Sequence, residues 1–119
     1  MKVSSDSLQA LETTLKALSD DNRIRILKML QCRSMCVCEI AYVLDIAQPS
    51  VSRHLKKLKK AGLIDSESNG PWTNYFIKPG GEYACVLMGT LAKWLDTDEV
   101  IAADRARMQT ADRGSLCCK

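Results

Sequence analysis

A chain of 119 residues is long enough for one ordinary domain and too short for two independent hydrophobic cores. Aromatic residues make up only 5% of it while aliphatic residues are plentiful, a composition typical of packed helices. The net charge is only +3, from 17 Lys and Arg against 14 Asp and Glu, so the total charge does not by itself indicate a protein that binds polyanions.

The N-terminal residues run directly into an amphipathic pattern. The sequence therefore shows neither a signal peptide nor a membrane span, and we expect a cytoplasmic protein with no membrane partner. Cytosolic thiols are kept reduced. The six cysteines accordingly point to metal binding, redox sensing or simple burial rather than to structural disulfides.

Leucines at three-and-four spacing predict a first helix over about residues 6 to 18. Polar residues 19 to 22 then supply stop and cap chemistry for a second helix, which is expected to end near residues 32 to 34. The inward side chains of this second helix are expected to be Ile24, Leu27 and Leu30, and the outward ones Arg23, Arg25 and Lys28.

Ser34 is a candidate cap for a third, short helix. Its inward stripe is expected to be Val37, Ile40, Ala41 and Leu44. Residues 45 to 48 are too few for anything but a turn, and Pro49 suits the first position of a fourth helix. That helix has an inward stripe of Val51, Leu55 and Leu58, and Gly62 is expected to close it.

Beyond the fourth helix, residues 63 to 69 and the strand-like residues 72 to 77 flank a Gly-Pro turn and predict a β-hairpin. Residues 82 to 95 carry the apolar stripe of a further helix, and residues 96 to 99 can restart or extend it. The tail beyond about Met108 is polar and is expected to be mobile.

This order of elements predicts a mainly α fold with a small β-hairpin (α+β), the winged helix-turn-helix. We expect residues 1–95 to form the DNA-binding and dimerisation domain, and residues 96–119 a C-terminal helical extension with a mobile, Cys-containing tail. The Leu-rich stripes of the first and last helices predict a homodimer formed through them. Alternatively, both helices pack only on their own monomer.

The fourth helix is strongly basic and contains no acidic residue. Helix-turn-helix proteins read bases with the N-terminal part of such a helix, where Arg pairs with guanine and Gln with adenine, while Lys suits phosphates. The candidate DNA-binding residues are Gln48, Ser50, Ser52, Arg53, Lys56, Lys57 and Lys60. His54, on the flank, is expected to make a phosphate or capping contact. The alternative is a solvated helix whose lysines keep the protein soluble.

An enzyme is not indicated. No nucleophile and base pair, catalytic carboxylate pair or phosphate-binding loop can be placed on this sequence.

Cys36 and Cys38 lie about 200° apart on a regular helix, on opposite sides of Val37. One ion reaches both only if the first turn is irregular or unwinds, and this turn belongs to the helix that supports the DNA-reading helix. Thiolates select soft or thiophilic ions such as trivalent arsenic or antimony, Cd²⁺, Pb²⁺ and Zn²⁺. The alternative is that both cysteines are small buried hydrophobes.

The other cysteines have weaker claims to a ligand role. Cys32 is near enough in sequence to be a third ligand, and Cys85 is expected to fill the core. Cys117 and Cys118 form an adjacent pair on the tail that is either an auxiliary metal site or incidental.

Three segments, residues 35–41 (MCVCEIA), 48–58 (QPSVSRHLKKL) and 61–64 (AGLI), resemble the ArsR/SmtB family of metal-responsive repressors. The resemblance covers roughly residues 10 to 95. It implies a dimeric winged-helix repressor that binds operator DNA when free of ligand and dissociates on metalloid binding. It also implies that Ser52 and Arg53 stand at the main base-reading positions, with Gln48 and Ser50 as neighbours.

The Cys-Val-Cys segment resembles the site of arsenic-responsive members and, with added N-terminal cysteines, of cadmium- and lead-responsive members. Here position 41 is Ala, where the arsenic type often has a further cysteine, and residues 1–31 contain none. Cys32 is then the best substitute. A Cys32, Cys36 and Cys38 set favours arsenic or antimony in the trivalent state as the inducer. A Cd(II)- or Pb(II)-responsive repressor and a cysteine redox switch are the alternatives.

Overall fold

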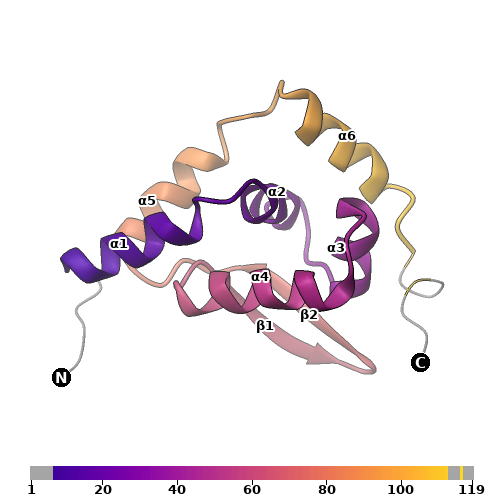
Figure 1. The fold of residues 1–119 in the computed structure, drawn as a ribbon, viewed down its shortest axis with the longest axis horizontal. Helices are drawn as coiled ribbons and strands as arrows, with labels where there is room; N and C mark the ends of the chain where they lie inside the picture. The colour runs from indigo at the N-terminus through magenta and orange to yellow at the C-terminus, as the bar shows by residue number, and fades with distance from the viewer. Residues whose placement is uncertain (1–6, 113–115, 117–119) are drawn as a thin grey trace.

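The computed structural model describes residues 7–112 and residue 116 of the chain. Along these residues run six helices and one hairpin, which are α1 (Leu8–Ala17), α2 (Asp21–Leu30), α3 (Val37–Leu44), α4 (Gln48–Lys60), β1 (Ile64–Asn69), β2 (Trp72–Ile77), α5 (Glu82–Leu91) and α6 (Glu99–Met108) (Figure 1). The predicted mixture of helices with one small hairpin is confirmed. None of these helices is long and apolar enough to cross a lipid bilayer.

Capping side chains explain where the helices begin. Ser7 accepts the backbone N–H of Ala10 at 3.0 Å at the start of α1, and Asp20 accepts that of Arg23 at 3.1 Å at the start of α2. The predicted cap of α3 was wrong, because the helix is capped by Cys36 and not by Ser34. The side chain of Glu39 accepts the N–H of Cys36 at 3.0 Å, which closes a capping box over the first turn.

The hairpin forms as predicted. Strands β1 and β2 are antiparallel, with Ile64 opposite Ile77 and Asn69 opposite Trp72. Gly70 occupies the turn at φ 62°, a left-handed conformation that suits glycine. Met35 exchanges two backbone hydrogen bonds with Tyr75, at 3.1 and 2.8 Å, so the residue that precedes Cys36 is attached to the hairpin.

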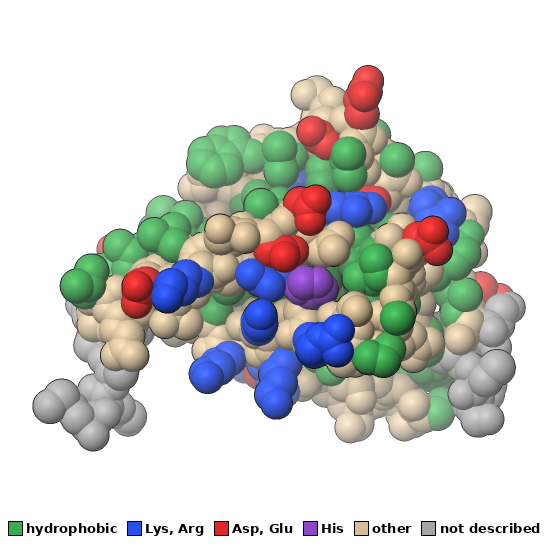
Figure 2. Space-filling model, viewed as in Figure 1, with side chains coloured by type: hydrophobic (Ala, Val, Ile, Leu, Met, Phe, Trp, Pro, Cys, Tyr) green, Lys and Arg blue, Asp and Glu red, His purple; other side chains and the backbone are tan. Residues whose placement is uncertain are grey.

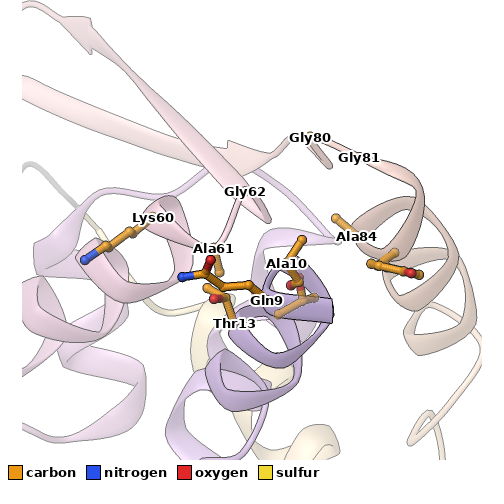
Figure 3. A pocket seen from close by; sticks show the side chains of 11 residues that line it. Gln9, Ala10, Thr13, Lys60, Ala61, Gly62, Gly80, Gly81 and Ala84 are labelled. Atoms are coloured by element: carbon orange, nitrogen blue, oxygen red, sulfur yellow. The ribbon is translucent and has the colours of Figure 1, made fainter. Parts of the chain in front are cut away.

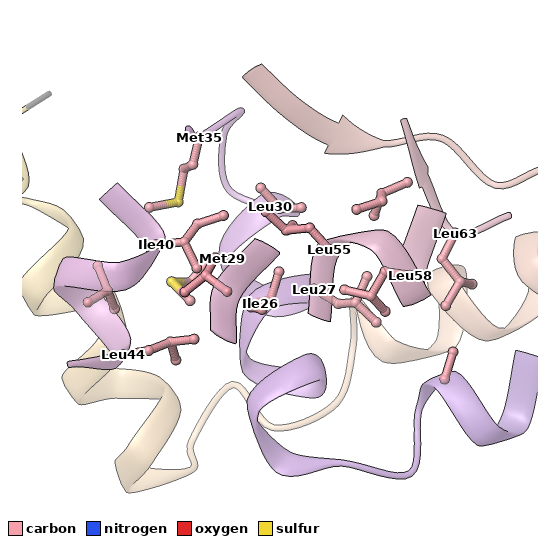
Figure 4. Close-up of a cluster of buried hydrophobic side chains, with 14 of the residues drawn as sticks. Ile26, Leu27, Met29, Leu30, Met35, Ile40, Leu44, Leu55, Leu58 and Leu63 are labelled. Carbon is pink, nitrogen blue, oxygen red and sulfur yellow. The ribbon is translucent and has the colours of Figure 1, made fainter. Parts of the chain in front are cut away.

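Helix α2 lies at the centre of the molecule, between α4 and α6 (Figure 1). The aliphatic core gathers around it (Figure 4). The core side chains with at most 1% of their surface exposed include Ile26, Leu27, Met29, Met35, Ile40, Val51, Leu55, Leu58 and Leu63. The expected inward stripe of α4 is therefore confirmed.

Two cations that were expected to point outward from α2 are buried. Only 9% of the surface of Arg23 and 2% of that of Lys28 are exposed. Arg23 donates to the carbonyl oxygens of Ala17 at 2.7 Å and Lys16 at 3.2 Å, at the C-terminal end of α1. Lys28 Nζ donates to the carbonyl of Leu91 at 2.9 Å, at the end of α5. The carbonyls that end a helix lack partners within it, so they attract these cations into the interior.

Helix α6 is separate from α5 and packs on α2 and α3. Its Met108 belongs to the same buried cluster as the other helices. A domain boundary at residue 95 remains a prediction, and most of the tail for which mobility was expected lies outside the described residues.

Candidate nucleic-acid interface and thiol site

Helix α4 presents a polar and cationic surface opposite its buried stripe. It begins at Gln48, one residue before the expected Pro49. Ser50 is half-buried, and the remaining predicted contacts are exposed, namely Gln48, Ser52, Arg53, Lys56, Lys57 and Lys60. Figure 2 shows Lys and Arg side chains gathered around the single histidine on this face. The structure thus places all seven candidate DNA-binding residues on one helix that is accessible to a large partner.

Arg53 is oriented by a neighbour on the same helix. Its Nη2 donates to Ser50 Oγ at 3.1 Å, which directs the guanidinium toward the N-terminal part of α4. That end of a recognition helix is the part that approaches base edges in the major groove. The exposed lysines lie nearer the C-terminal end, where phosphate contacts are expected.

The hairpin is attached to α4 by lysines and an acidic residue. Lys59 Nζ donates to Ser66 Oγ at 2.9 Å and lies 3.7 Å from one carboxylate oxygen of Asp65. The other carboxylate oxygen of Asp65 lies 3.9 Å from Lys78 Nζ. These contacts hold the hairpin beside α4.

A basic cavity extends from α4 toward α1. It measures about 430 Å³ and is lined by Gln9, Thr13, Lys16, Ala17, Arg23, Lys57 and Lys60. A second cavity of about 340 Å³ lies between α1, the C-terminal end of α4 and the start of α5 (Figure 3). Small side chains and glycines such as Ala61, Gly62 and Gly80 make up much of its lining.

His54 lies under the cationic face. The sequence predicts a phosphate or capping contact for this side chain, and in the structure its Nδ1 lies 3.4 Å from Arg23 Nη1, a donor. Burial lowers the pKa of His54 below its ordinary 6.5, and the cations of Arg23, Lys57 and Arg53 lower it further while Asp20 opposes them. Neutral His54 can accept the hydrogen bond from Arg23, whereas a protonated ring cannot.

The structure places Cys36 and Cys38 at the start of α3, as predicted, but in different environments. Cys36 is the N-cap and is buried, with 2% of its surface exposed. Cys38, in the first turn, is half-buried, and its Sγ accepts a hydrogen bond from Gln48 Nε2 at 3.6 Å. The thiol of Cys32 is exposed and donates to the carbonyl of Lys28 at 3.6 Å. Cys85 is exposed, so its expected role in the core was wrong.

The sulfurs of the described cysteines are not assembled into a ligand set. Among the described residues, no three or more His, Cys, Asp and Glu side chains are grouped closely enough to hold a metal ion. Cys38 is disulfide-bonded, whereas Cys32, Cys36 and Cys85 form no disulfide, so the expectation of reduced thiols is not met at Cys38. Cys117 and Cys118 lie outside the described residues.

Sequence spacing gave no sign that the end of α6 lies against α3. Arg107 donates to the carbonyls of Tyr42 at 2.6 Å and Val43 at 3.2 Å, and its guanidinium carbon lies 4.4 Å from the centroid of the Tyr42 ring. Arg33 donates to the carbonyl of Met108 at 3.1 Å. Its guanidinium also lies 3.4 Å from the carboxylate of Glu39, which accepts the backbone N–H of Cys36. The C-terminal end of α6 and the N-terminal turn of α3 therefore share one side of the molecule.

Comparison with known proteins agrees with this geometry. The profile described as "Bacterial regulatory protein, arsR family" matches residues 20–66. The chain is 44% identical over 64 residues to the cadmium resistance transcriptional regulatory protein CadC of Listeria innocua, a match that covers 53% of this chain and 54% of CadC. The chain thus spans about half the length of that relative.

A longer match is to the arsenic resistance transcriptional regulator ArsR2 of Pseudomonas putida, at 33% identity over 109 residues, which covers 87% of this chain and 93% of ArsR2. Among solved structures, the homodimeric winged helix-turn-helix DNA-binding domain of Mb0332 from Mycobacterium bovis superposes with a TM-score of 0.64 at 26% identity, covering 83% of this chain and 94% of that domain. These proteins are DNA-binding transcriptional regulators rather than enzymes. The match to ArsR2 over most of both chains, with the profile match, shows that the chain belongs to the arsR family of bacterial regulatory proteins.

Proposed function

We propose that this protein is a homodimeric transcriptional repressor that holds double-stranded operator DNA through α4 and the hairpin and releases it when trivalent arsenic or antimony binds thiolates at the start of α3. The observation that carries the proposal is the position of Cys38, whose sulfur contacts the first residue of the DNA-reading helix. Ligand chemistry at that sulfur therefore acts directly on the DNA-binding element. A regulator of this kind works in the cytoplasm, where the operator is.

The thiol chemistry suits a soft ligand. Sulfur donors select arsenic, antimony, cadmium and lead over Mg²⁺ and Ca²⁺. Cys36 is the N-cap of α3 and Cys38 lies in the first turn of that helix, so both sulfurs belong to one helix start. Each arsenic–sulfur bond that forms displaces one hydroxyl of arsenious acid, which leaves as water with the proton of the thiol.

Loading must change the first turn of α3. Cys36 is buried, and its side chain and that of Glu39 form the capping box that begins the helix. To bind the same ion as Cys38, Cys36 must leave this box, which removes a cap worth about 1 kcal/mol. Formation of the bonds to sulfur therefore disorders the first turn of α3, the helix that supports α4.

A third thiolate comes either from Cys32 or from the C-terminal pair. Cys32 is exposed, and to bind an ion its thiol must break the hydrogen bond that it donates to the Lys28 carbonyl. The C-terminal pair follows α6 in the chain, and α6 ends beside α3, where Arg33 donates a hydrogen bond to the carbonyl of Met108. The nine residues that follow Met108, up to and including Cys117, can span up to about 30 Å, so chain length excludes neither source.

The proposed dimer uses the first and last helices of the sequence prediction, which correspond to α1 and α5. These helices contact each other, and they leave Leu8 85%, Leu15 48% and Val86 60% exposed. Exposed apolar surface of this kind is most simply covered by a second copy of the same chain. The homodimeric state of the Mycobacterium bovis neighbour supports the arrangement.

The test is a titration of operator binding at fixed salt under anaerobic, reducing conditions. Arsenite, antimonite, Cd²⁺ and Pb²⁺ are added to the wild type, Cys32→Ser, Cys36→Ser, Cys38→Ser and a Cys117→Ser/Cys118→Ser double variant, with Cys85→Ser as the matched control. We expect arsenite to release DNA from the wild type and the control, but not from Cys36→Ser or Cys38→Ser.

Loss of the response in Cys32→Ser or in the C-terminal double variant identifies the source of the third thiolate. A stronger response to Cd²⁺ or Pb²⁺ than to arsenite favours the cadmium or lead repressor. Unchanged DNA affinity with arsenite, or a full response in Cys36→Ser, contradicts the proposal.

The disulfide at Cys38 favours a redox switch as a second candidate function. Two thiols lose two protons and two electrons when a disulfide forms, and hydrogen peroxide can accept them all to give two molecules of water. In this case, stoichiometric hydrogen peroxide without metalloid releases the wild type from the operator, and a dithiol reductant restores binding. A metalloid response under anaerobic, reducing conditions with no response to peroxide rejects this candidate.

A further inference from the structure

Gln48 has a position that no other described residue of α4 shares. It is the first residue of the DNA-reading helix, its side chain is exposed, and its Nε2 donates at 3.6 Å to Cys38 Sγ, which is in a disulfide in this structure and is a thiol under the reducing conditions of the tests below. One amide thus lies between a proposed ligand sulfur and the surface proposed to face DNA.

The backbone between Cys38 and Gln48 holds this geometry in place. Helix α3 ends with Asp45 in the left-handed region at φ 56°, and the N–H of Ile46 bonds to the carbonyl of Ala41 at 3.3 Å. Ala47 then caps α4, and its carbonyl accepts the N–H groups of Ser50 at 3.0 Å and Val51 at 3.2 Å. With both ends of this short turn bonded, displacement of Cys38 is transmitted to the start of α4.

We infer that Gln48 is the positioning residue that couples ligand binding at Cys38 to release of DNA, an inference that rests on the proposed function. A glutamine that reads adenine uses both its amide oxygen and its amide nitrogen, so the same side chain cannot also lie against the sulfur of Cys38. DNA and Cys38 therefore compete for one side chain.

Ligand loading favours the sulfur in this competition. The sulfur of a free thiol is a weak acceptor. A sulfur bound to a metal or metalloid has lost its proton, carries partial negative charge and is fixed in place, which strengthens an N–H donated to it. Gln48 is then retained at α3 and withdrawn from the DNA. By linkage, any contact of Gln48 with DNA weakens ligand binding at Cys38 by the same factor.

The first experiment needs no DNA. Arsenite affinity is measured under reducing conditions for the wild type, Gln48→Met and Ser52→Ala, a matched control on the same face of α4. Because Gln48→Met removes one hydrogen bond to the loaded sulfur, it should weaken arsenite binding by about two- to tenfold. Ser52→Ala should leave arsenite affinity unchanged. Equal arsenite affinity in Gln48→Met and the wild type overturns the inference.

The second experiment observes the amide itself in the intact protein. The side-chain NH₂ resonances of Gln48 are assigned by their loss in Gln48→Met and followed by ¹⁵N NMR as arsenite is added. We expect them to shift on loading in the wild type and to stay unchanged in Cys38→Ser, while those of Gln9, exposed on α1, do not move in either protein. Gln48 resonances that stay unchanged when arsenite occupies the wild type also overturn the inference.

Measurements of operator binding distinguish failure of the proposed function from failure of the Gln48 inference alone. The ratio of ligand-free to arsenite-loaded DNA affinity should fall at least about fivefold in Gln48→Met and much less in Ser52→Ala. If the wild type itself shows no change of DNA affinity with arsenite, the proposed function fails and the inference with it. If the wild type responds and Gln48→Met responds to the same extent, only the coupling role of Gln48 is wrong.

Discussion

Arg25 and Asp104 are 79 residues apart in the sequence and form an ion pair with two hydrogen bonds between α2 and α6. Arg25 Nε donates to one carboxylate oxygen at 2.9 Å and Nη2 to the other at 2.7 Å. The Asp104 side chain is only 3% exposed, and this pairing raises the pKa of Arg25 above its ordinary value. The pair attaches α6 to the centre of the domain.

Removing one partner of this pair should be costly. We expect Arg25→Ala to lower the free energy of unfolding by about 3–5 kcal/mol, because the carboxylate of Asp104 is left buried without its cation. Lys16→Ala is the control, since Lys16 pairs with Glu12 at 3.6 Å where both side chains are largely exposed, and its loss should cost less than about 1 kcal/mol. Urea denaturation at one protein concentration measures both. Equal losses would show that the burial of Asp104 has no energetic effect.

His54 should titrate below its ordinary pKa of 6.5. The unfolded chain then binds this proton at a higher pH than the folded protein, so stability is full above about pH 6.5 and declines as the pH falls below it. The single histidine makes the NMR titration unambiguous. His54→Gln should lose less stability than the wild type between pH 7 and pH 5. A midpoint at or above 6.5 in the folded protein would contradict this prediction.

Lys60 should contact phosphate rather than bases. Lys60→Ala is expected to weaken binding to operator and random DNA alike, and to reduce the slope of log affinity against log salt concentration by about 0.9. Lys93→Ala, which removes the same charge from an exposed position beyond α5, should leave this slope unchanged. Anisotropy titrations at several salt concentrations measure both slopes. A loss confined to the operator would instead make Lys60 a base contact.

Arg53 should behave in the opposite way. It is exposed and directed by Ser50 toward the N-terminal part of α4. Arg53→Ala should weaken operator binding by about 1–3 kcal/mol and have little effect on random DNA. The two affinities are compared at one salt concentration. An equal loss on both DNAs would assign Arg53 to a phosphate.

Leu15 should lie in the dimer interface. Leu15→Glu places a charge on the apolar surface of α1, and we expect it to shift the protein from dimer to monomer and to weaken operator binding. Val100→Glu is the control, because Val100 is 49% exposed, close to the 48% of Leu15, but lies on α6. Sedimentation equilibrium measures both states. A dimer in Leu15→Glu and a monomer in Val100→Glu would place the interface on α6.

The sequence by itself determined the local elements and the types of chemistry they carry. The buried stripe of Val51, Leu55 and Leu58 and the exposed basic surface of α4 follow from helical periodicity, which depends only on neighbours along the chain. The hairpin follows from two strand-like segments around a Gly-Pro turn in the same way. The placement of two cysteines at the start of α3 is also a local property.

Only the tertiary structure decided how these elements meet. Arg23 and Lys28 are buried because they donate to backbone carbonyls at the ends of α1 and α5. Gln48 contacts Cys38 because the turn between α3 and α4 folds one helix start against the other. Periodicity predicts which face of a helix is buried. It contains no information about which other helix has its end packed against that face. The contact between Cys38 of α3 and the first residue of α4 is such a meeting, and the fold alone reveals it.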